Sequence, residues 1–258
     1  MACFLENHPN IRTLLFNAYG EERIPNVNSL LPNLEALSMD NWGQTAINSY
    51  NELLGANPPR KITYFKTGRY PYDQYRLIPQ YAPSLRCLEL SLDIEKIRDE
   101  DDVQYQTTKS LLALLPNLTE FAAHFSSGWT TIYDEEDDTS RNPLPMDEDI
   151  LSKILKALPP PPKSSNLQVL RMKDVDDGKG PPLVLDQSST TFASSFLREN
   201  MPASLKVLQW ETDNSIMRYE FEPGQSVGGV RVVDPPEQRQ WPDTMLWTDA
   251  SILMHLRS

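Results

Sequence analysis

Cysteine and histidine are scarce in this sequence. Its 258 residues include two cysteines, Cys3 and Cys87, and three histidines. Cysteines this far apart give neither a disulfide framework nor the spacing of metal ligands, and His8, His124 and His255 share no motif. We therefore expect no disulfide scaffold and no bound metal or other cofactor. We also expect a reduced intracellular protein, in the cytoplasm or the nucleus.

Long apolar runs and enzyme motifs are missing too. No stretch approaches the roughly 18 apolar residues of a membrane span, and the N-terminus lacks the basic start and apolar stretch of a signal peptide. The sequence contains no G-x-S-x-G, no Gly-rich phosphate loop and no H-E-x-x-H. We expect neither membrane association nor enzymatic activity.

Two short segments match known motifs only in part. Asp174–Gly180 (DVDDGKG) differs from a calcium loop because its Gly comes one place early and the closing Glu is missing, so we interpret it as a turn. Pro159–Pro162 is interpreted as a stiff extended spacer, and recruitment of a Pro-binding module is the alternative.

An excess of positive charge is also absent. The chain has 36 acidic and 24 basic residues, and three acidic runs, Asp99–Asp102, Asp134–Asp138 and Asp147–Asp149, account for the whole difference of 12. Such runs repel themselves and belong in solvated loops or tails, with an acidic docking site as the alternative. We expect the first two runs to be dispensable for folding. No cationic cluster is visible in the sequence, so nucleic acid is not an expected partner.

What the sequence does contain is a recurring motif. LLPNLEAL begins at Leu30 and LLPNLTEF at Leu114. In both, an apolar anchor follows Pro-Asn, and further apolar residues follow three and five positions later. Self-similarity of this kind is typical of repeat proteins. The spacing recurs, with one weaker third copy, at Ile11, Leu34, Ile62, Leu85, Leu118, Leu167 and Leu205.

Each copy predicts a short strand with one apolar face and one polar face. The last two apolar positions are two residues apart, so their side chains leave the same face of a strand. A Pro or Ser before the anchor suits a turn that leads into the strand. We predict that Leu37, Leu88, Leu170 and Leu208 are buried. We also predict one parallel sheet in sequence order, with strands near Thr13–Phe16, Ala36–Met39, Tyr64–Phe65, Cys87–Leu90, Glu120–Ala123, Val169–Met172 and Val207–Trp210.

Segments with helical patterning separate these strands. Asp147–Leu158 places its apolar residues on one face and its acids at the N-terminal end, and Val103–Leu115 ends where a proline follows. Further helices are predicted at Thr45–Leu54, Tyr72–Ile78 and Ser189–Glu199. Strands and helices that alternate in this way predict an α/β fold with a parallel sheet. A doubly wound sheet is the main alternative, but it does not predict a recurring strand motif, whereas a repeat array does.

The pattern resembles the L-x-x-L-x-L core of leucine-rich repeats from about Ile11 to Trp210. Its PNL phrasing, irregular repeat lengths and insertions resemble fungal F-box/leucine-rich-repeat proteins most. The resemblance implies an irregular leucine-rich-repeat solenoid, a curved parallel sheet with helices on its convex side. The Asn usual eight residues after the anchor is replaced in every copy, so we expect irregular repeats. The F-box, which normally lies upstream of the repeats in these proteins, is not visible in this chain, and finding one upstream of Met1 would favour an F-box protein.

We divide the chain into residues 1–213, a solenoid of about seven repeats, and residues 214–258, a C-terminal cap. Within the cap, SIMRYEF and VGGVRVV predict a hairpin, and Thr248–Leu256 predicts a closing helix. We expect Trp241 and Trp247 to cover the open end of the array, because a terminal repeat needs such a cover. Stacking of these two rings on a ligand is the alternative.

A partner-binding face follows from the predicted register. Strands stacked about 4.8 Å apart would align the residues two, four and six places after each anchor in columns on the concave face. An exposed Tyr and Arg on such a face tend to anchor a protein partner, and a solvated face with no partner is the alternative. The candidate residues are Tyr64, Lys66, Glu89, His124, Arg171, Lys173, Gln209 and Glu211.

Two functional hypotheses fit this face. The first is a protein-interaction module, and the resemblance implies the substrate-recognition region of an F-box-type adaptor of a cullin-type ubiquitin ligase. The second is a free-standing leucine-rich-repeat scaffold or inhibitor with no ubiquitin role. An enzymatic or small-molecule role is the third alternative.

Overall fold

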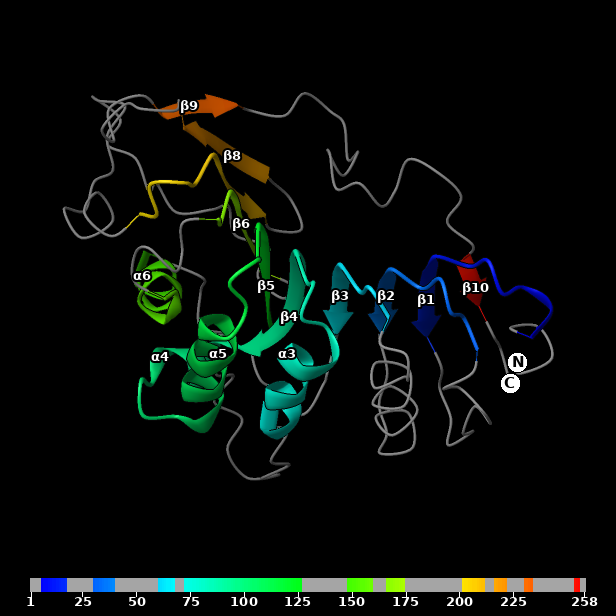
Figure 1. Ribbon diagram of the computed structural model, residues 1–258. Coiled ribbons are helices and arrows are strands. Elements are labelled where there is room, and N and C mark those ends of the chain that lie inside the picture. The colour runs from blue at the N-terminus through cyan, green and yellow to red at the C-terminus, as the bar shows by residue number, and fades with distance from the viewer. Residues whose placement is uncertain are drawn as a thin grey trace, which may run out of the picture.

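In the part of the chain that the structure describes, the fold is built on a single sheet. The computed structural model of the chain (Figure 1) describes residues 6–17, 30–39, 60–67, 72–126, 148–159, 166–174, 201–211, 216–221, 230–233 and 253–255. Ten strands form this sheet in the order β10-β1-β2-β3-β4-β5-β6-β7-β8-β9. They are β1 Thr13–Asn17, β2 Ala36–Met39, β3 Tyr64–Thr67, β4 Cys87–Asp93, β5 Glu120–Ser126, β6 Val169–Asp174, β7 Val207–Glu211, β8 Ile216–Phe221, β9 Val230–Val233 and β10 Leu253–His255.

Strands β1 to β7 are parallel and lie side by side in sequence order, which confirms the predicted α/β architecture with a parallel sheet. The register is also the predicted one, because equivalent positions of the repeat are paired: Ser38 lies beside Lys66, and Lys66 beside Glu89. The order of these seven strands never reverses, so the sheet is not doubly wound.

One face of the sheet carries the core. Successive side chains of a strand point to opposite faces, and the apolar set Leu37, Leu88, Leu170 and Leu208 is fully buried, as predicted. Figure 1 shows that the row of strands bends between β4 and β8 and that the described helices lie on the outer side of the bend. These helices are η2 Tyr72–Leu77 (a 3₁₀ helix), α3 Ile78–Tyr81, α4 Ile94–Arg98, α5 Val103–Ala113 and α6 Glu148–Ala157.

Helices α5 and α6 confirm two of the predicted helical segments. The segment predicted at Tyr72–Ile78 is instead mostly a 3₁₀ helix that continues into α3. Pro79 occupies the first turn of α3, where its missing N–H is tolerated. Helix α4 was not predicted because its five residues are too few to show a period.

Each strand from β2 to β7 begins with the same backbone contact. The carbonyl oxygen of the residue before one strand accepts two N–H groups from the start of the next strand: Arg86 O accepts from Thr119 N at 2.8 Å and from Glu120 N at 2.9 Å. These paired contacts fix the register where the strands start. The equivalent carbonyls that accept in this way are those of Arg12, Glu35, Thr63, Thr119 and Gln168.

The Pro-Asn motif forms the turn that leads into the strands. Leu118 N donates to Leu115 O at 3.2 Å and closes a four-residue turn. Asn117, inside that turn, donates from Nδ2 to Pro83 O of the preceding turn at 3.4 Å. Asparagines therefore link successive turns, although they stand before the anchor and not eight residues after it. Matching contacts join Leu34 to Leu31, Leu85 to Ala82, Leu205 to Pro202, Asn33 to Pro9 and Asn166 to Pro116.

The weak third copy, anchored at Ile62, has Arg60 in place of this turn. The Arg60 side chain is buried and donates to the preceding turn, from Nε to Leu31 O at 3.0 Å and from Nη2 to Leu30 O. Leu31 has a φ of 54°, a left-handed conformation that is unusual for Leu. Arg60 thus ties the segment that enters β3 to the turn before β2, which accounts for a strand where the sequence pattern is poorest.

The acidic run Asp99–Asp102 lies between α4 and α5 with Asp99 and Asp101 exposed, and its dispensability for folding stays a prediction that the contacts of Glu100 and Asp102 oppose. Asp102 caps α5 by accepting the N–H of the second helical residue at 2.6 Å. Glu100 lies 2.6 Å from Lys153 Nζ and 3.1 Å from Lys156 Nζ, both on α6. The run therefore connects α5 with α6. The sequence could not show this because the two lysines are more than 50 residues away.

The C-terminal hairpin is confirmed, but the predicted closing helix is wrong. Strand β8 pairs antiparallel with β7 and with β9. Within Thr248–Leu256, residues Leu253–His255 form β10, which pairs in parallel with β1 at the opposite edge of the sheet. The free backbone N–H and C=O groups of an edge strand can pair with another strand. They cannot pair with a helix, because its backbone groups are already bonded within the helix.

Several predicted features lie outside the described residues. They are Thr45–Leu54, Asp134–Asp138, Ser189–Glu199, Trp241 and Trp247.

Among the residues that the structure does describe, none of the helices is long and apolar enough to cross a membrane.

Candidate protein-binding face

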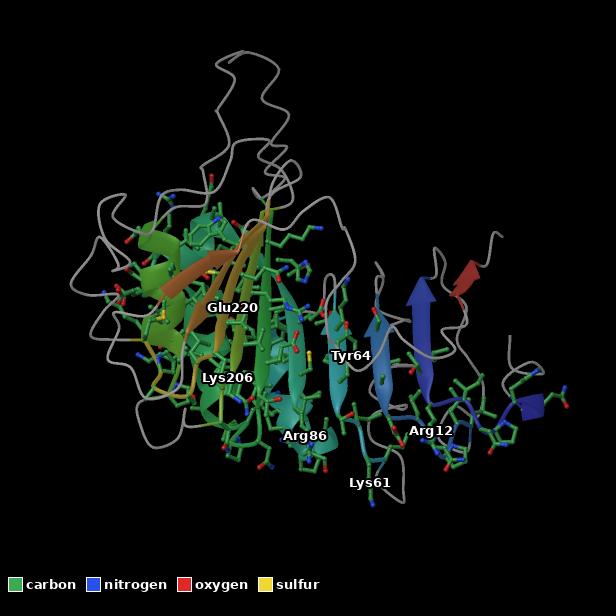
Figure 2. The ribbon with its side chains drawn as sticks, turned by 90° about the horizontal axis from the view of Figure 1, so that it is seen from above. Arg12, Lys61, Tyr64, Arg86, Lys206 and Glu220 are labelled. Atoms are coloured by element: carbon green, nitrogen blue, oxygen red, sulfur yellow. The ribbon has the colours of Figure 1, made fainter. Side chains whose placement is uncertain are left out.

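The inner face of the sheet, opposite the helices, is polar. Alternation along β3 to β7 places the candidate side chains on this face, and Figure 2 shows Tyr64 within the row of strands. We call this surface the polar face. Its members are Tyr64 and Lys66 from β3, Cys87 and Glu89 from β4, Glu120 and His124 from β5, Arg171 and Lys173 from β6, and Gln209 from β7.

Glu89 is the centre of the polar face. Its Oε1 accepts a hydrogen bond from the Tyr64 hydroxyl at 2.9 Å, and its Oε2 lies 3.0 Å from His124 Nε2 and 3.9 Å from Lys66 Nζ. The Glu89 side chain is only 5% exposed. Burial alone would raise the pKa of this carboxyl, but His124, Lys66 and Tyr64 together lower it below its ordinary value. Glu89 is therefore an ionised acceptor that joins three strands.

The ionised state of Glu89 determines which neighbouring groups donate hydrogen bonds to it. A carboxylate only accepts, so His124 donates to it through Nε2–H. Burial first, and the Glu89 charge second, raise the pKa of the Tyr64 hydroxyl far above its ordinary value. Tyr64 is therefore a fixed donor at neutral pH. Two hydrogen bonds and the ion pair with Lys66 on one buried carboxylate restrict the positions of these side chains.

Glu120 and Arg171 form a second pair beside the first. Arg171 Nη2 lies 2.6 Å from Glu120 Oε1, and the two side chains are 9% and 13% exposed. Burial raises the pKa of Glu120, Arg171 opposes the rise, and the charge of Glu89 adds to it. The polar face thus holds one carboxylate that is easily ionised and another that resists ionisation.

Cys87 is close to both carboxylates, since it is paired with Glu120 on β5 and comes two residues before Glu89 on β4. Burial raises the pKa of its thiol, and the charges of Glu120 and Glu89 raise it further. The thiol stays protonated at neutral pH and is a poor nucleophile, since the thiolate is the reactive form. Within the described residues, no three His, Cys, Asp or Glu side chains gather in a way that could hold a metal ion.

The expectation that Tyr64 and Arg171 are exposed is wrong. Tyr64, Arg171 and Gln209 are 5%, 7% and 4% exposed. The physical reason is that strands about 4.8 Å apart let long polar side chains lie across their neighbours and pair with them. A partner can reach Lys66, which is 31% exposed, and the half-buried Ser91, His124 and Lys173. The backbone of Glu211 pairs with Lys173, as the predicted column requires.

The sequence predicts that these residues share one face, but their mutual contacts were not predicted. The repeat pattern contained a signal for these contacts, because Lys66 and Glu89 occupy the same position of neighbouring repeats. Tyr64 lies two residues before that position in its repeat, and His124 two residues after it in its own. Opposite charges at such neighbouring positions are expected to pair.

The chain was also compared with known proteins. No model of a known protein family matches it, and no curated protein matches it.

Proposed function

We propose that this chain is a protein-protein interaction module that binds its partner on the polar face. The observation that carries the proposal is the arrangement around Glu89. Side chains from three neighbouring strands are held by one ionised carboxylate, so the surface is ordered before a partner arrives. A preorganised surface loses less conformational entropy on binding than a mobile one.

The finer proposal is an irregular leucine-rich-repeat solenoid, acting as the substrate-recognition region of an F-box-type ubiquitin ligase adaptor. It is supported by the repeated turn, by the sequence order of strands β1 to β7 and by helices on the outer side of the bend. A free-standing scaffold or inhibitor with no ubiquitin role is the second candidate, since the same features suit it. We propose a non-enzymatic protein of the cytoplasm or nucleus in either case.

Substitutions at the reachable positions of the polar face test the proposal. Lys66→Glu combined with Ser91→Arg changes charge and shape there without removing Glu89. The matched control is Lys109→Glu combined with Ser110→Arg, two neighbouring exposed positions on α5. Each purified variant is used to capture proteins from lysate, with quantification by mass spectrometry and a melting curve to check folding.

We expect the face variant to lose partners that the wild type and the helix variant retain. Equal capture by all three proteins would overturn the proposed face. Subunits of a cullin-type ligase that co-purify with the full-length protein would favour the adaptor, and partners without those subunits would favour the scaffold.

A further inference from the structure

The start of each parallel strand presents one side chain at a common rim of the sheet. We call these seven positions the start row: Arg12, Glu35, Thr63, Arg86, Thr119, Gln168 and Lys206. The paired hydrogen bonds of their carbonyls place each member beside the next one. Their side chains are exposed or half-buried. In sequence they are 20 or more residues apart, and only the register of the sheet brings them together.

The start row is rich in cations although the chain is strongly acidic. Arg12, Arg86 and Lys206 are exposed members, and Lys61 is exposed two residues before Thr63. Figure 2 shows these four labelled cations along one rim, with Tyr64 farther along the strands. In the described part of the chain, Arg12 has an ion pair, at 3.9 Å with Glu35, whose side chain is 50% exposed. Lys61, Arg86 and Lys206 form no ion pair with the described residues.

The spacing of these cations is regular. Arg12 and Arg86 are three strands apart, and so are Arg86 and Lys206. Neighbouring strands are about 4.8 Å apart, so each interval is about 14 Å. An extended peptide advances about 3.4 Å per residue, so about four of its residues span one interval.

We propose that the start row binds an extended acidic segment of a protein partner, laid across the strands with carboxylates about four residues apart. The inference rests on the proposed binding function and names the chemistry of the partner. An acidic peptide is favoured over nucleic acid for two reasons. The net charge of −12 repels a dense polyanion at long range, and the cations are too widely spaced for duplex DNA, which carries about one charge per 1.7 Å.

The test measures fluorescence anisotropy of a labelled peptide with Glu at every fourth position and Ser and Gly between them. Wild-type protein should bind it at low ionic strength, more weakly as salt is added, and should not bind a version with Gln in place of Glu. The rim variant is Arg86→Glu with Lys206→Glu. The matched control is Arg76→Glu with Lys109→Glu, an exposed Arg and Lys on the helices, which changes the net charge equally.

We expect the rim variant to lose about tenfold or more in affinity and the control about twofold or less, since screened distant charges act weakly. Failure of the wild type to bind, or equal losses in both variants, would overturn the inference. Tighter, rim-dependent binding of duplex DNA would assign the start row to nucleic acid instead. If the peptide fails but Lys66→Glu with Ser91→Arg still abolishes partner capture, the proposed function stands and the acidic segment does not.

Discussion

At the scale of single residues, the polar face depends on Glu89 more than on any other described side chain. It accepts from Tyr64 and His124 and pairs with Lys66. A buried carboxylate is costly unless it is paired and hydrogen-bonded. Here the donors come from both neighbouring strands, so one ionised group aligns β3, β4 and β5.

Replacing Glu89 by Gln should lower the free energy of unfolding at neutral pH by about 2 kcal/mol, because charge-assisted contacts become neutral ones. The exposed Glu35→Gln is the matched control and should change it by less than about 0.5 kcal/mol. Denaturant unfolding of both variants beside the wild type provides the measurement.

The same variant should also change the pH dependence of stability. The folded pKa of Glu89 lies below its ordinary value of 4.5. Its contribution is therefore present above pH 4.5 and is lost as the pH falls through the folded pKa. The difference between wild type and Glu89→Gln should narrow on acidification, and a difference that stays constant would show that Glu89 is not ionised in the folded state.

Arg60 has the corresponding role between the start of β3 and the turn before β2. Arg60→Met should cost about 2 kcal/mol, because it leaves the carbonyls of Leu30 and Leu31 without their buried donor. Lys61→Met, at the exposed neighbouring position, should be nearly neutral in the same thermal unfolding experiment. Equal losses at both positions would mean that Arg60 does not hold this turn.

At the scale of elements, the helix layer is tied together by an acidic turn between α4 and α5. Asp102→Ala should cost about 1 kcal/mol through loss of the α5 N-cap. Asp101→Ala, at an exposed position in the same run, should leave the melting temperature nearly unchanged. If the two variants behave alike, the run is a solvated loop after all.

The elements differ in how far their sequences predict them. The seven strands of the repeat were predictable because alternation and the Pro-Asn turn recur in phase, and α5 and α6 because they are long enough to show a helical period. Strand β10 was mistaken for a helix, since its short apolar segment becomes a strand only by pairing with β1. Such tertiary pairing leaves no local signal.

The sequence predicts on which face of the sheet the candidate side chains lie, but not how deeply they are buried. Alternation assigns Tyr64 and Arg171 to the polar face, but it cannot show that neighbouring side chains cover them. The sequence contains no signal for the start row, because Arg12, Glu35 and Thr63 occupy equivalent positions of the repeat but have different kinds of side chain. Register alone gathers them.

At the scale of the whole molecule, one parallel register accounts for the core, the polar face and the start row. It buries apolar strand positions such as Leu37, Leu88 and Leu170 on one side and aligns polar side chains on the other. It also separates charge, since cations line the rim of a chain whose net charge is −12. Both functional proposals depend on this register.

Distances across the start row therefore test the account most directly. Spin labels are placed in pairs at Arg12, Arg86 and Lys206, after both native cysteines are replaced by serine, and the separations are measured by pulsed electron paramagnetic resonance. Sequence order predicts two similar short distances, about 14 Å between backbones for Arg12 to Arg86 and for Arg86 to Lys206. Arg12 to Lys206 should be the longest, approaching about 29 Å and shortened by the bend of the sheet. If Arg86 does not lie midway between the other two labels, the strands are not in sequence order, and the polar face and the start row do not exist as described.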